Sequence, residues 1–585
     1  MSLRSPFRLY FPAFCITSAV APVLADDLPA AVIEQRQSVQ EAQRQQQLQQ
    51  LQPQPDVRLD APPVQAVQAL PQGETPCFAV NRISLEGDEA GRFGFALAQA
   101  LERSGFEAGM CLGAQGINHI MTLAQNALIG RGYTTTRILA APQDLNEGAL
   151  VLTVVPGRIR EIRVDTADVV HTHADRIVSF QNEFPAAAGD ILNLRDLEQG
   201  LENLKRIPTA EADIRIVPAD KPSESDVVVV WRQREVPFRV SVGVDDSGSK
   251  ATGKYQGSIT LSADNPLGLS DLFYASYNRD LGHKASYTDA EGRHTGSGTN
   301  GYNLHYSVPF GYWQAFWNHS YYRYHQAVAG DSQNYDYNGK SYTSEAGLSR
   351  LLYRDARRKT HITAKLWQRE SESFIDDAPI EVQHRRTAGW AVGVTHKEYL
   401  GQATLDFGIN YKRGTGRNRS LKAPEEAFGE GVSRAEILNA DVGLNLPFAL
   451  GRQLFAYDTQ AHMQWSRKPL VPQDRLAIGN RYTVRGFDGE TVLSAERGWY
   501  WRNDWSWQYL PTHQVYLAAD AGRVSGPSAQ YLAGQTLVGA AIGLKGQVKA
   551  GGNLSYNLFA GKPLKKPARF QTASATYGFN LNYSF

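Results

Sequence analysis

The segment Val484-Arg485-Gly486-Phe487 is the motif in this sequence with the clearest potential for specific chemistry. It lies in a long stretch, residues 468–494, that separates two segments of regularly alternating apolar and polar residues. If this arginine folds into an interior it needs an acidic partner, because an unpaired buried charge is strongly destabilising. The polar side of segment 515–521 offers Asp520, and the neighbouring segment offers Asp504, so both are candidate partners.

The N-terminus has the pattern of a secretory signal peptide, residues 1–25. Two arginines supply the charged start, an apolar stretch covers residues 9–24, and Ala25 ends an acceptable cleavage site. A transmembrane anchor is the alternative, but the stretch is short and contains two prolines. We therefore expect an exported protein.

Cys77 and Cys111 are the two cysteines that remain when Cys15 is removed with the signal peptide. Export and an even count favour a disulfide between them. Closing a loop of this size stabilises a fold by roughly 4 kcal/mol in the chain-entropy model. A pair of buried free thiols is the alternative, which export makes the weaker interpretation.

The other candidate motifs do not support catalysis. Residues 296–301 match the spacing of a dinucleotide-binding fingerprint, but residues 302–308 look like a strand where that fingerprint requires a helix. We interpret these glycines as a hairpin. The 13 histidines are scattered, and no metalloprotease helix, nucleophile elbow or cysteine-histidine cluster is present. The sequence predicts no enzyme, no cofactor and no metal site.

Composition narrows the class of protein. A mean hydropathy of −0.39 and 20% charged residues exclude a helical membrane protein. A β-barrel remains possible, because strands carry their apolar residues in alternation, and 52 glycines and 10% aromatic residues suit one. Without Arg4 and Arg8, 58 basic residues face 59 acidic ones, a formal charge of −1, which gives no sign of nucleic-acid binding.

Strand-like alternation runs from residue 238 to the C-terminus. In residues 573–585 every odd position is apolar or aromatic and every even position is polar or glycine, over a length sufficient to cross a membrane as a tilted strand. Tryptophans at alternate positions of 499–507 resemble an interfacial aromatic belt. Counting such segments gives sixteen antiparallel strands, and lipid requires that they close into a barrel. We expect this transmembrane β-barrel over residues 235–585.

A doubled unit precedes the barrel. Strands are expected at 78–85, 135–140 and 149–155 and helices at 91–104 and 116–131, and the order β-α-α-β-β then repeats. The second unit has strands at 160–164, 212–217 and 226–231 and helices at 174–181 and 194–205. These patterns predict two small α+β domains, residues 76–157 and 158–234.

The glutamine-rich segment 26–52 is long enough for a helix of membrane height, but it is polar all round. Its apolar residues, Val39, Leu48 and Leu51, are too sparse for a core-facing stripe. Such a segment could sit in solvent, be disordered, or lie in a water-filled lumen, and composition alone favours a flexible segment. Residues 53–75 are proline-rich and are expected to form a linker.

This order of features resembles the two-partner secretion transporters (TpsB), the family of haemolysin and filamentous-haemagglutinin exporters. The resemblance covers the whole mature chain and includes five local matches: Cys77-Phe78, Cys111-Leu112-Gly113, Arg131-Gly132-Tyr133, Val155-Pro156-Gly157-Arg158-Ile159 and Leu192-Asn193-Leu194-Arg195-Asp196. It implies that the two α+β units are POTRA domains and that segment 26–52 is a helix that plugs the lumen.

The resemblance also implies roles for the motif. The family's Val-Arg-Gly-Tyr/Phe loop folds into the barrel, and its arginine pairs with a wall aspartate, which matches Asp520. The glycine or phenylalanine usual two positions before that aspartate is Ala518 here. The implied protein is a monomeric translocator in the bacterial outer membrane, with POTRA domains in the periplasm and lipid around the barrel. Its partner would be one large exoprotein: a haemolysin, an adhesin or a contact-dependent toxin.

Two other functions compete with export. A barrel-assembly factor for outer-membrane proteins would have the same architecture, although such insertases carry more POTRA repeats and lack the plug helix. A porin or an adhesin would need no tandem periplasmic domains. The sequence favours the dedicated exporter.

Overall fold

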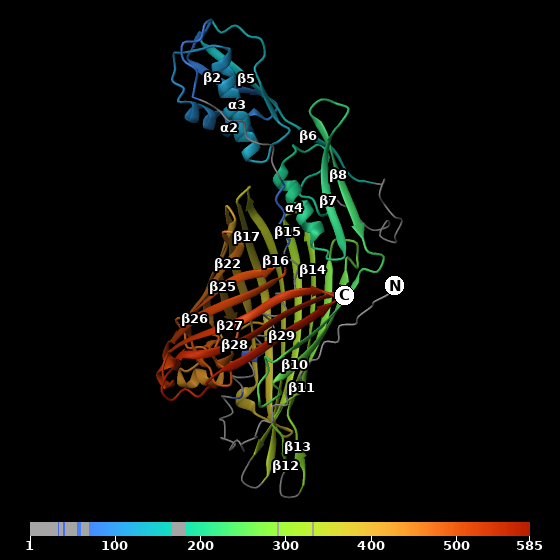
Figure 1. The fold of residues 1–585 in the computed structure, drawn as a ribbon, viewed down its shortest axis with the longest axis vertical. Coiled ribbons are helices and arrows are strands. Elements are labelled where there is room, and N and C mark those ends of the chain that lie inside the picture. Colours follow the sequence, from blue (N-terminus) through green and yellow to red (C-terminus); the bar gives the residue numbers. More distant parts are fainter. Residues whose placement is uncertain are drawn as a thin grey trace, which may run out of the picture.

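The structure is a computed structural model that describes residues 33, 39–40, 55–59, 69–165, 182–288, 292–329 and 333–585. The predicted signal peptide lies outside the described residues, as do most of segment 26–52 and the helix predicted at 174–181. Two small α+β domains stack on one end of a β-barrel, and the second domain lies between the first domain and the barrel (Figure 1).

The first domain has a three-stranded sheet of order β2-β5-β4, in which β2 and β5 are parallel. Helices α2 and α3 bury an apolar stripe against it, because residues such as Phe93 and Leu97 recur at helical spacing. The predicted strand 78–85 is two strands, and the first pairs with β3, which the sequence did not reveal. The elements are β1 (Phe78–Val80), β2 (Arg82–Gly87), α2 (Ala90–Ser104), β3 (Met110–Leu112), α3 (Ala114–Gly130), β4 (Arg137–Leu139) and β5 (Ala149–Val155).

The second domain repeats this arrangement with a sheet of order β6-β8-β7. Asn193 caps its helix, since the Asn193 side chain accepts a hydrogen bond from the Arg195 N–H at 2.8 Å. Leucines at 194, 197, 201 and 204 are buried against the sheet. The elements are β6 (Arg158–Val164), α4 (Leu194–Lys205), β7 (Ala210–Pro218) and β8 (Glu224–Gln233).

The described part of residues 238–585 forms a closed antiparallel barrel of sixteen strands, which confirms the prediction. A two-residue strand, β18 (Ala378–Pro379), adds to its rim. The sixteen are β9 (Phe238–Asp245), β10 (Tyr255–Asp264), β11 (Leu272–Gly282), β14 (Gly298–Phe310), β15 (Trp313–Ala329), β16 (Asn334–Arg354), β17 (Arg358–Ile375), β19 (Arg385–Leu400), β20 (Ala403–Thr415), β21 (Glu436–Leu450), β22 (Gln453–Trp465), β25 (Arg497–Leu510), β26 (His513–Ser525), β27 (Thr536–Lys549), β28 (Asn553–Lys565) and β29 (Thr576–Ser584).

The barrel wall alternates between an apolar outer face and a polar inner face. Trp499, Trp501, Trp505 and Trp507 are exposed on the outside of β25, whereas Asp520 on β26 is buried. The glycine-rich residues 296–301 do not form the expected hairpin, because most of them belong to β14; a hairpin of β12 (Tyr287–Thr288) and β13 (His294–Thr295) precedes it. Hairpin β12–β13 lies at the end of the barrel away from the α+β domains (Figure 1).

Among the described residues, no helix is both long enough and apolar enough to cross a membrane.

Candidate functional site

The long segment between β22 and β25 packs against the inner wall of the barrel. Its base is a short hairpin of β23 (Leu476–Ile478) and β24 (Leu493–Ala495). Val484 and Phe487 are buried in an apolar cluster with Val524 and Leu537 of the wall strands β26 and β27. The Phe487 ring also meets Phe570 edge-to-face, with ring centroids 5.8 Å apart. The segment is therefore a folded element with its own small core.

Arg485 lies at the centre of this contact and is bound to Asp520. The backbone N–H of Arg485 donates to Asp520 Oδ2 at 3.0 Å, and its guanidinium donates to Oδ2 at 2.6 Å and to Oδ1 at 2.7 Å. Both side chains are almost fully buried. The paired N–H groups of arginine match the two oxygens of a carboxylate, so this geometry fixes orientation as well as charge.

The second candidate partner also contributes. Arg485 Nη2 lies 2.5 Å from Asp504 Oδ1 and donates to the Asn503 carbonyl oxygen at 3.3 Å. The Asn503 N–H in turn donates to Asp520 Oδ1 at 3.2 Å, so β25 and β26 jointly hold the arginine. The sequence offered Asp504 and Asp520 as alternatives, and the structure brings Arg485 to both.

Gly486 allows the motif to approach the wall closely. Its φ is +95°, and a Cβ on this residue would lie 2.5 Å from the Lys562 carbonyl oxygen. A Cβ on Gly539 of β27 would likewise lie 1.9 Å from the Arg485 carbonyl oxygen. Glycine is therefore required on both sides of the contact, since any side chain would push the backbone away.

The predicted disulfide is present in the first domain. Cys77 and Cys111 are bonded, with Cα atoms 5.4 Å apart and 34 residues of sequence separation. Glu74, close by in sequence, accepts hydrogen bonds from the backbone N–H groups of Gly113, Gln115 and Gly116 at 2.8, 2.8 and 2.9 Å. Burial acts to raise the pKa of Glu74, but these three donors at the start of α3 outweigh it, and the pKa lies below its ordinary value.

The described residues of segment 26–52, Ile33, Val39 and Gln40, are helical. Ile33 is only 2% exposed and packs with Tyr322, Tyr324 and Tyr337, which line the inside of β15 and β16. The Tyr322 hydroxyl donates to Gln40 Oε1 at 3.4 Å. Ile33 is not among Val39, Leu48 and Leu51, the apolar residues from which a polar segment was predicted.

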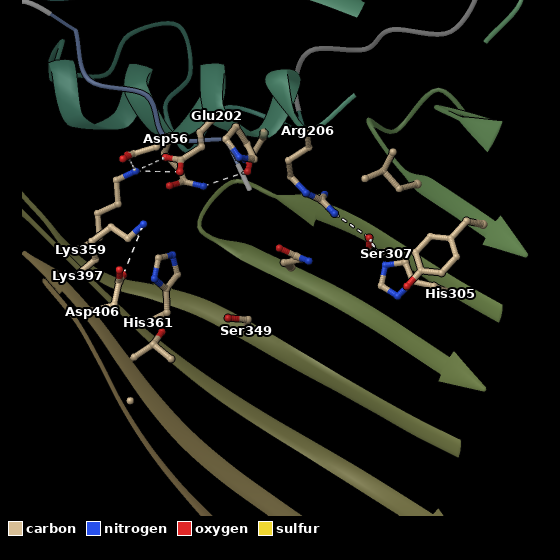
Figure 2. A pocket seen from close by; sticks show the side chains of 18 of the residues that line it. Asp56, Glu202, Arg206, His305, Ser307, Ser349, Lys359, His361, Lys397 and Asp406 are labelled. Atoms are coloured by element: carbon tan, nitrogen blue, oxygen red, sulfur yellow. Dashed lines mark hydrogen bonds and ion pairs between the residues drawn. The ribbon is translucent and has the colours of Figure 1, made fainter. Parts of the chain in front are cut away.

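The second domain docks on the barrel mouth through α4 and the linker (Figure 2). Lys359 of β17 donates to Asp56 of the linker at 2.6 Å and to Glu202 of α4 at 2.9 Å. Arg354, at the end of β16, donates to Glu198 at 3.0 Å and also binds Glu202. Linker, α4 and barrel thus share one ion-pair network.

The same mouth opens into a cavity of about 590 Å³ lined mostly by polar and charged side chains, among them Arg206, Ser307, His361 and Asp406 (Figure 2). Arg206 reaches from the end of α4 and donates to the Ser307 hydroxyl at 2.7 Å. Burial lowers the pKa of Arg206 to about 10. The arrangement is suited to holding polar groups.

Within the part of the chain that the structure describes, one group of side chains could offer ligands to a metal ion. Glu370, Glu372 and His384 present ligand atoms within 4.8 Å of one another. Lys340 binds Glu372 at 2.9 Å and Arg386 lies 3.7 Å from Glu370, so cations already accompany both carboxylates. We read this group as an ion-pair network.

Comparison with known proteins agrees with this architecture. Residues 223–546 match the family described as haemolysin secretion/activation protein ShlB/FhaC/HecB, residues 78–157 match a POTRA domain of ShlB type, and residues 158–218 match a POTRA domain. The chain is 37% identical over 583 residues to outer membrane transporter CdiB-2 of Burkholderia pseudomallei (strain 1026b), covering 97% of this chain and 96% of the relative. It is 25% identical to hemolysin transporter protein ShlB of Serratia marcescens, over 71% of each chain. The solved structure of CdiB from Acinetobacter baumannii matches with a TM-score of 0.80 at 31% identity, covering 96% of this chain and 100% of that one.

Proposed function

This chain belongs to the ShlB/FhaC/HecB family of haemolysin secretion/activation proteins, and from that premise we propose that it exports one large partner protein. It is an outer-membrane transporter of two-partner secretion, with its POTRA domains in the periplasm. We further propose which class of protein it exports and which parts of the chain act during export: the loop, the plug helix and the edges of the POTRA sheets. None of these roles is a catalytic step.

The observation that carries the proposal is the folded loop inside the barrel. A lumen that passes a polypeptide must be occupied at rest and cleared during export. Arg485, held by Asp520 and Asp504, gives the loop one defined seat on the wall. Ile33 packs on three tyrosines that face the lumen. This contact supports the proposal that segment 26–52 is the plug helix and lies in the same lumen as the loop.

Capture of the partner fits the sheet edges of the two POTRA domains. In the described residues, β7 pairs only with β8 and β4 pairs only with β5, so each sheet offers an outer strand. An extended segment of the partner would add to such an edge by main-chain hydrogen bonds. The partner would then thread through the lumen after the plug helix leaves, and folding outside would favour its forward movement.

The partner belongs to the class of large secreted β-helical exoproteins. The curated relatives include transporters named CdiB and hemolysin transporters, which supports a haemolysin, an adhesin or a contact-dependent toxin. We propose that the transporter acts as a monomer, because a closed barrel leaves no strand edge to pair in lipid.

Deletion of the gene separates this proposal from barrel assembly. The exported partner should disappear from the medium and accumulate in the periplasm, while porin levels in the outer membrane stay unchanged. Complementation with the wild-type chain should restore secretion. Loss of several unrelated outer-membrane proteins would instead indicate an insertion factor, and normal secretion would refute export.

A further inference from the structure

The barrel closes where β29 pairs with β9, and this seam has few main-chain bonds. Its register covers five residue pairs, from Asn580–Asp245 to Ser584–Ser241, and Val240 and Phe585 exchange two further hydrogen bonds. The ladders on either side, β28–β29 and β9–β10, have nine and eight pairs. Among the sixteen long strands that the structure describes, the seam is the shortest ladder between neighbours.

The seam ends before Phe579 and Asp246, which would form its next rung at the end away from the POTRA domains. Side chains replace the missing backbone bonds. The Phe579 N–H donates to the Asp246 carboxylate at 2.8 Å, and the Phe579 carbonyl oxygen accepts from Arg481 Nη1 at 3.2 Å. Both main-chain groups of Phe579 are therefore satisfied without a backbone partner on β9.

Arg481 joins the two strands because its guanidinium serves both of them. Its Nη2 donates to the Asp246 carbonyl oxygen at 3.2 Å and binds the Asp246 carboxylate. The guanidinium also lies over the Phe559 ring of β28, 5.3 Å from the ring centroid. The side chain of Asp246 is 4% exposed and that of Arg481 is 16% exposed, so water competes little for these bonds.

Arg481 belongs to the loop inside the barrel, four residues before Arg485. The loop thus has one charged anchor on β26 and another across the seam. We infer that Arg481 is a positioning residue that supplies the last rung between β9 and β29 from the loop, so that closure of the barrel depends on the loop being seated. A loop that leaves its seat removes this rung and leaves the Phe579 carbonyl oxygen without its donor.

Arg481→Gln tests the inference in the full-length protein in detergent micelles. Hydrogen exchange should accelerate by tenfold or more at the amides of residues 579–583. On SDS gels, the compact band of the folded barrel should convert to the unfolded band at a lower temperature than in the wild-type protein. Arg502→Gln is the matched control, because Arg502 donates to Tyr482 in the same loop at 3.2 Å but lies on β25, away from the seam. It should leave exchange in β29 unchanged.

A disulfide across the seam separates closure from general damage to the loop. Ser241 and Ser584 face each other one pair from the hydrogen-bonded Val240–Phe585 pair, a non-hydrogen-bonded position where Cα atoms lie about 4.5 Å apart, within disulfide range. Adding S241C and S584C to Arg481→Gln should restore heat resistance and slow exchange at residues 581–583. The Phe579 amide should continue to exchange quickly.

Three results would overturn the inference: unchanged exchange in Arg481→Gln, equal acceleration in Arg502→Gln, or a formed disulfide that restores neither heat resistance nor exchange. These measurements need no cargo. A negative result for the seam would not contradict the proposed export function. A negative result in the secretion experiment would not contradict the role of Arg481 at the seam.

Discussion

Arg485 and Asp520 are joined through three hydrogen bonds, one from the arginine backbone and two from its guanidinium, at 3.0, 2.6 and 2.7 Å. Asp520 therefore fixes the main chain of the motif as well as its charge. Because Val484 and Phe487 flank the arginine and are buried in the wall cluster, the ion pair and the apolar contacts hold the loop in the same position. Loss of either acidic or basic partner would leave a buried charge beside an apolar surface.

Arg485→Ala and Asp520→Ala should each unseat the loop and reduce secretion of the exoprotein, with less effect on insertion of the barrel. Removing one partner of a shielded pair costs about 3–5 kcal/mol, and water in the lumen will reduce that figure. If the two residues act as a pair, the double variant should secrete no less than either single variant. Secretion measured by immunoblot of culture medium, normalised to barrel level, gives the comparison.

Arg485→Lys is the control for charge alone in this series. It keeps one positive charge and the backbone bond but loses the paired donors, so its secretion should fall between wild type and Arg485→Ala. Additive losses in the double variant would mean that Arg485 and Asp520 work separately.

Gly539→Ala should displace the motif without changing any charge. Its Cβ would lie 1.9 Å from the Arg485 carbonyl oxygen, far inside van der Waals contact. Gly443→Ala on β21 is the matched control, because its Cβ would meet nothing nearer than Asp406 Cβ at 3.7 Å. Hydrogen exchange at residues 483–487 should rise several-fold in Gly539→Ala and stay at the wild-type level in Gly443→Ala; equal behaviour of the two would contradict the close contact.

Periodicity made the barrel predictable, because a period of two over sixteen segments leaves few alternatives in lipid. The same alternation placed Asp520 on the inner face, where the structure puts it. Short elements were missed for a physical reason: β3 has three residues and is defined by its partner β1, not by its own pattern. Segment 573–585 alternates over thirteen residues, yet β29 covers only Thr576–Ser584, because a strand ends where its neighbours stop pairing.

Contacts between distant segments could not be predicted from the sequence. Ile33 lies in a glutamine-rich segment whose composition gave no sign of a buried contact, and its cluster with three tyrosines on β15 and β16 is set by the fold. Arg481 carries no pattern of its own, since its role depends on where β9 and β29 stop pairing. The ion pairs of Lys359 with Asp56 and Glu202 likewise join residues far apart in the chain.

Loss of the disulfide should destabilise the first POTRA domain. For residues 34 apart in sequence, the chain-entropy model gives a loss of about 4 kcal/mol when the cross-link is removed. In a Cys77→Ser, Cys111→Ser variant, residues 78–155 should become more sensitive to protease while the barrel stays folded. Mass spectrometry of the unreduced wild-type chain should find the two cysteines linked, and two alkylatable thiols would contradict the bond in the mature protein.

Glu74→Gln should speed hydrogen exchange of the backbone amides at the start of α3, and it should do so at neutral pH only. The pKa of Glu74 is lowered in the folded protein, so its contribution is present above the unfolded value of about 4.3 and is lost as pH falls through the folded value. Exchange at the Gln115 and Gly116 amides, compared between wild type and variant at each pH, should differ at pH 7 and converge as the pH falls below about 4. A difference that persisted unchanged in acid would show that the charge of Glu74 does not hold the helix.

Removal of segment 27–51 should open the pore. Ile33 and Gln40 contact tyrosines on the inner face of β15 and β16, which places these helical residues against the lumen wall. Deletion should therefore raise single-channel conductance in planar bilayers while the barrel remains folded. Ile33→Asp should raise it partway, because a carboxylate buried among three tyrosines loses its hydration and weakens the helix's hold on the wall. Unchanged conductance in both variants would place the helix outside the pore.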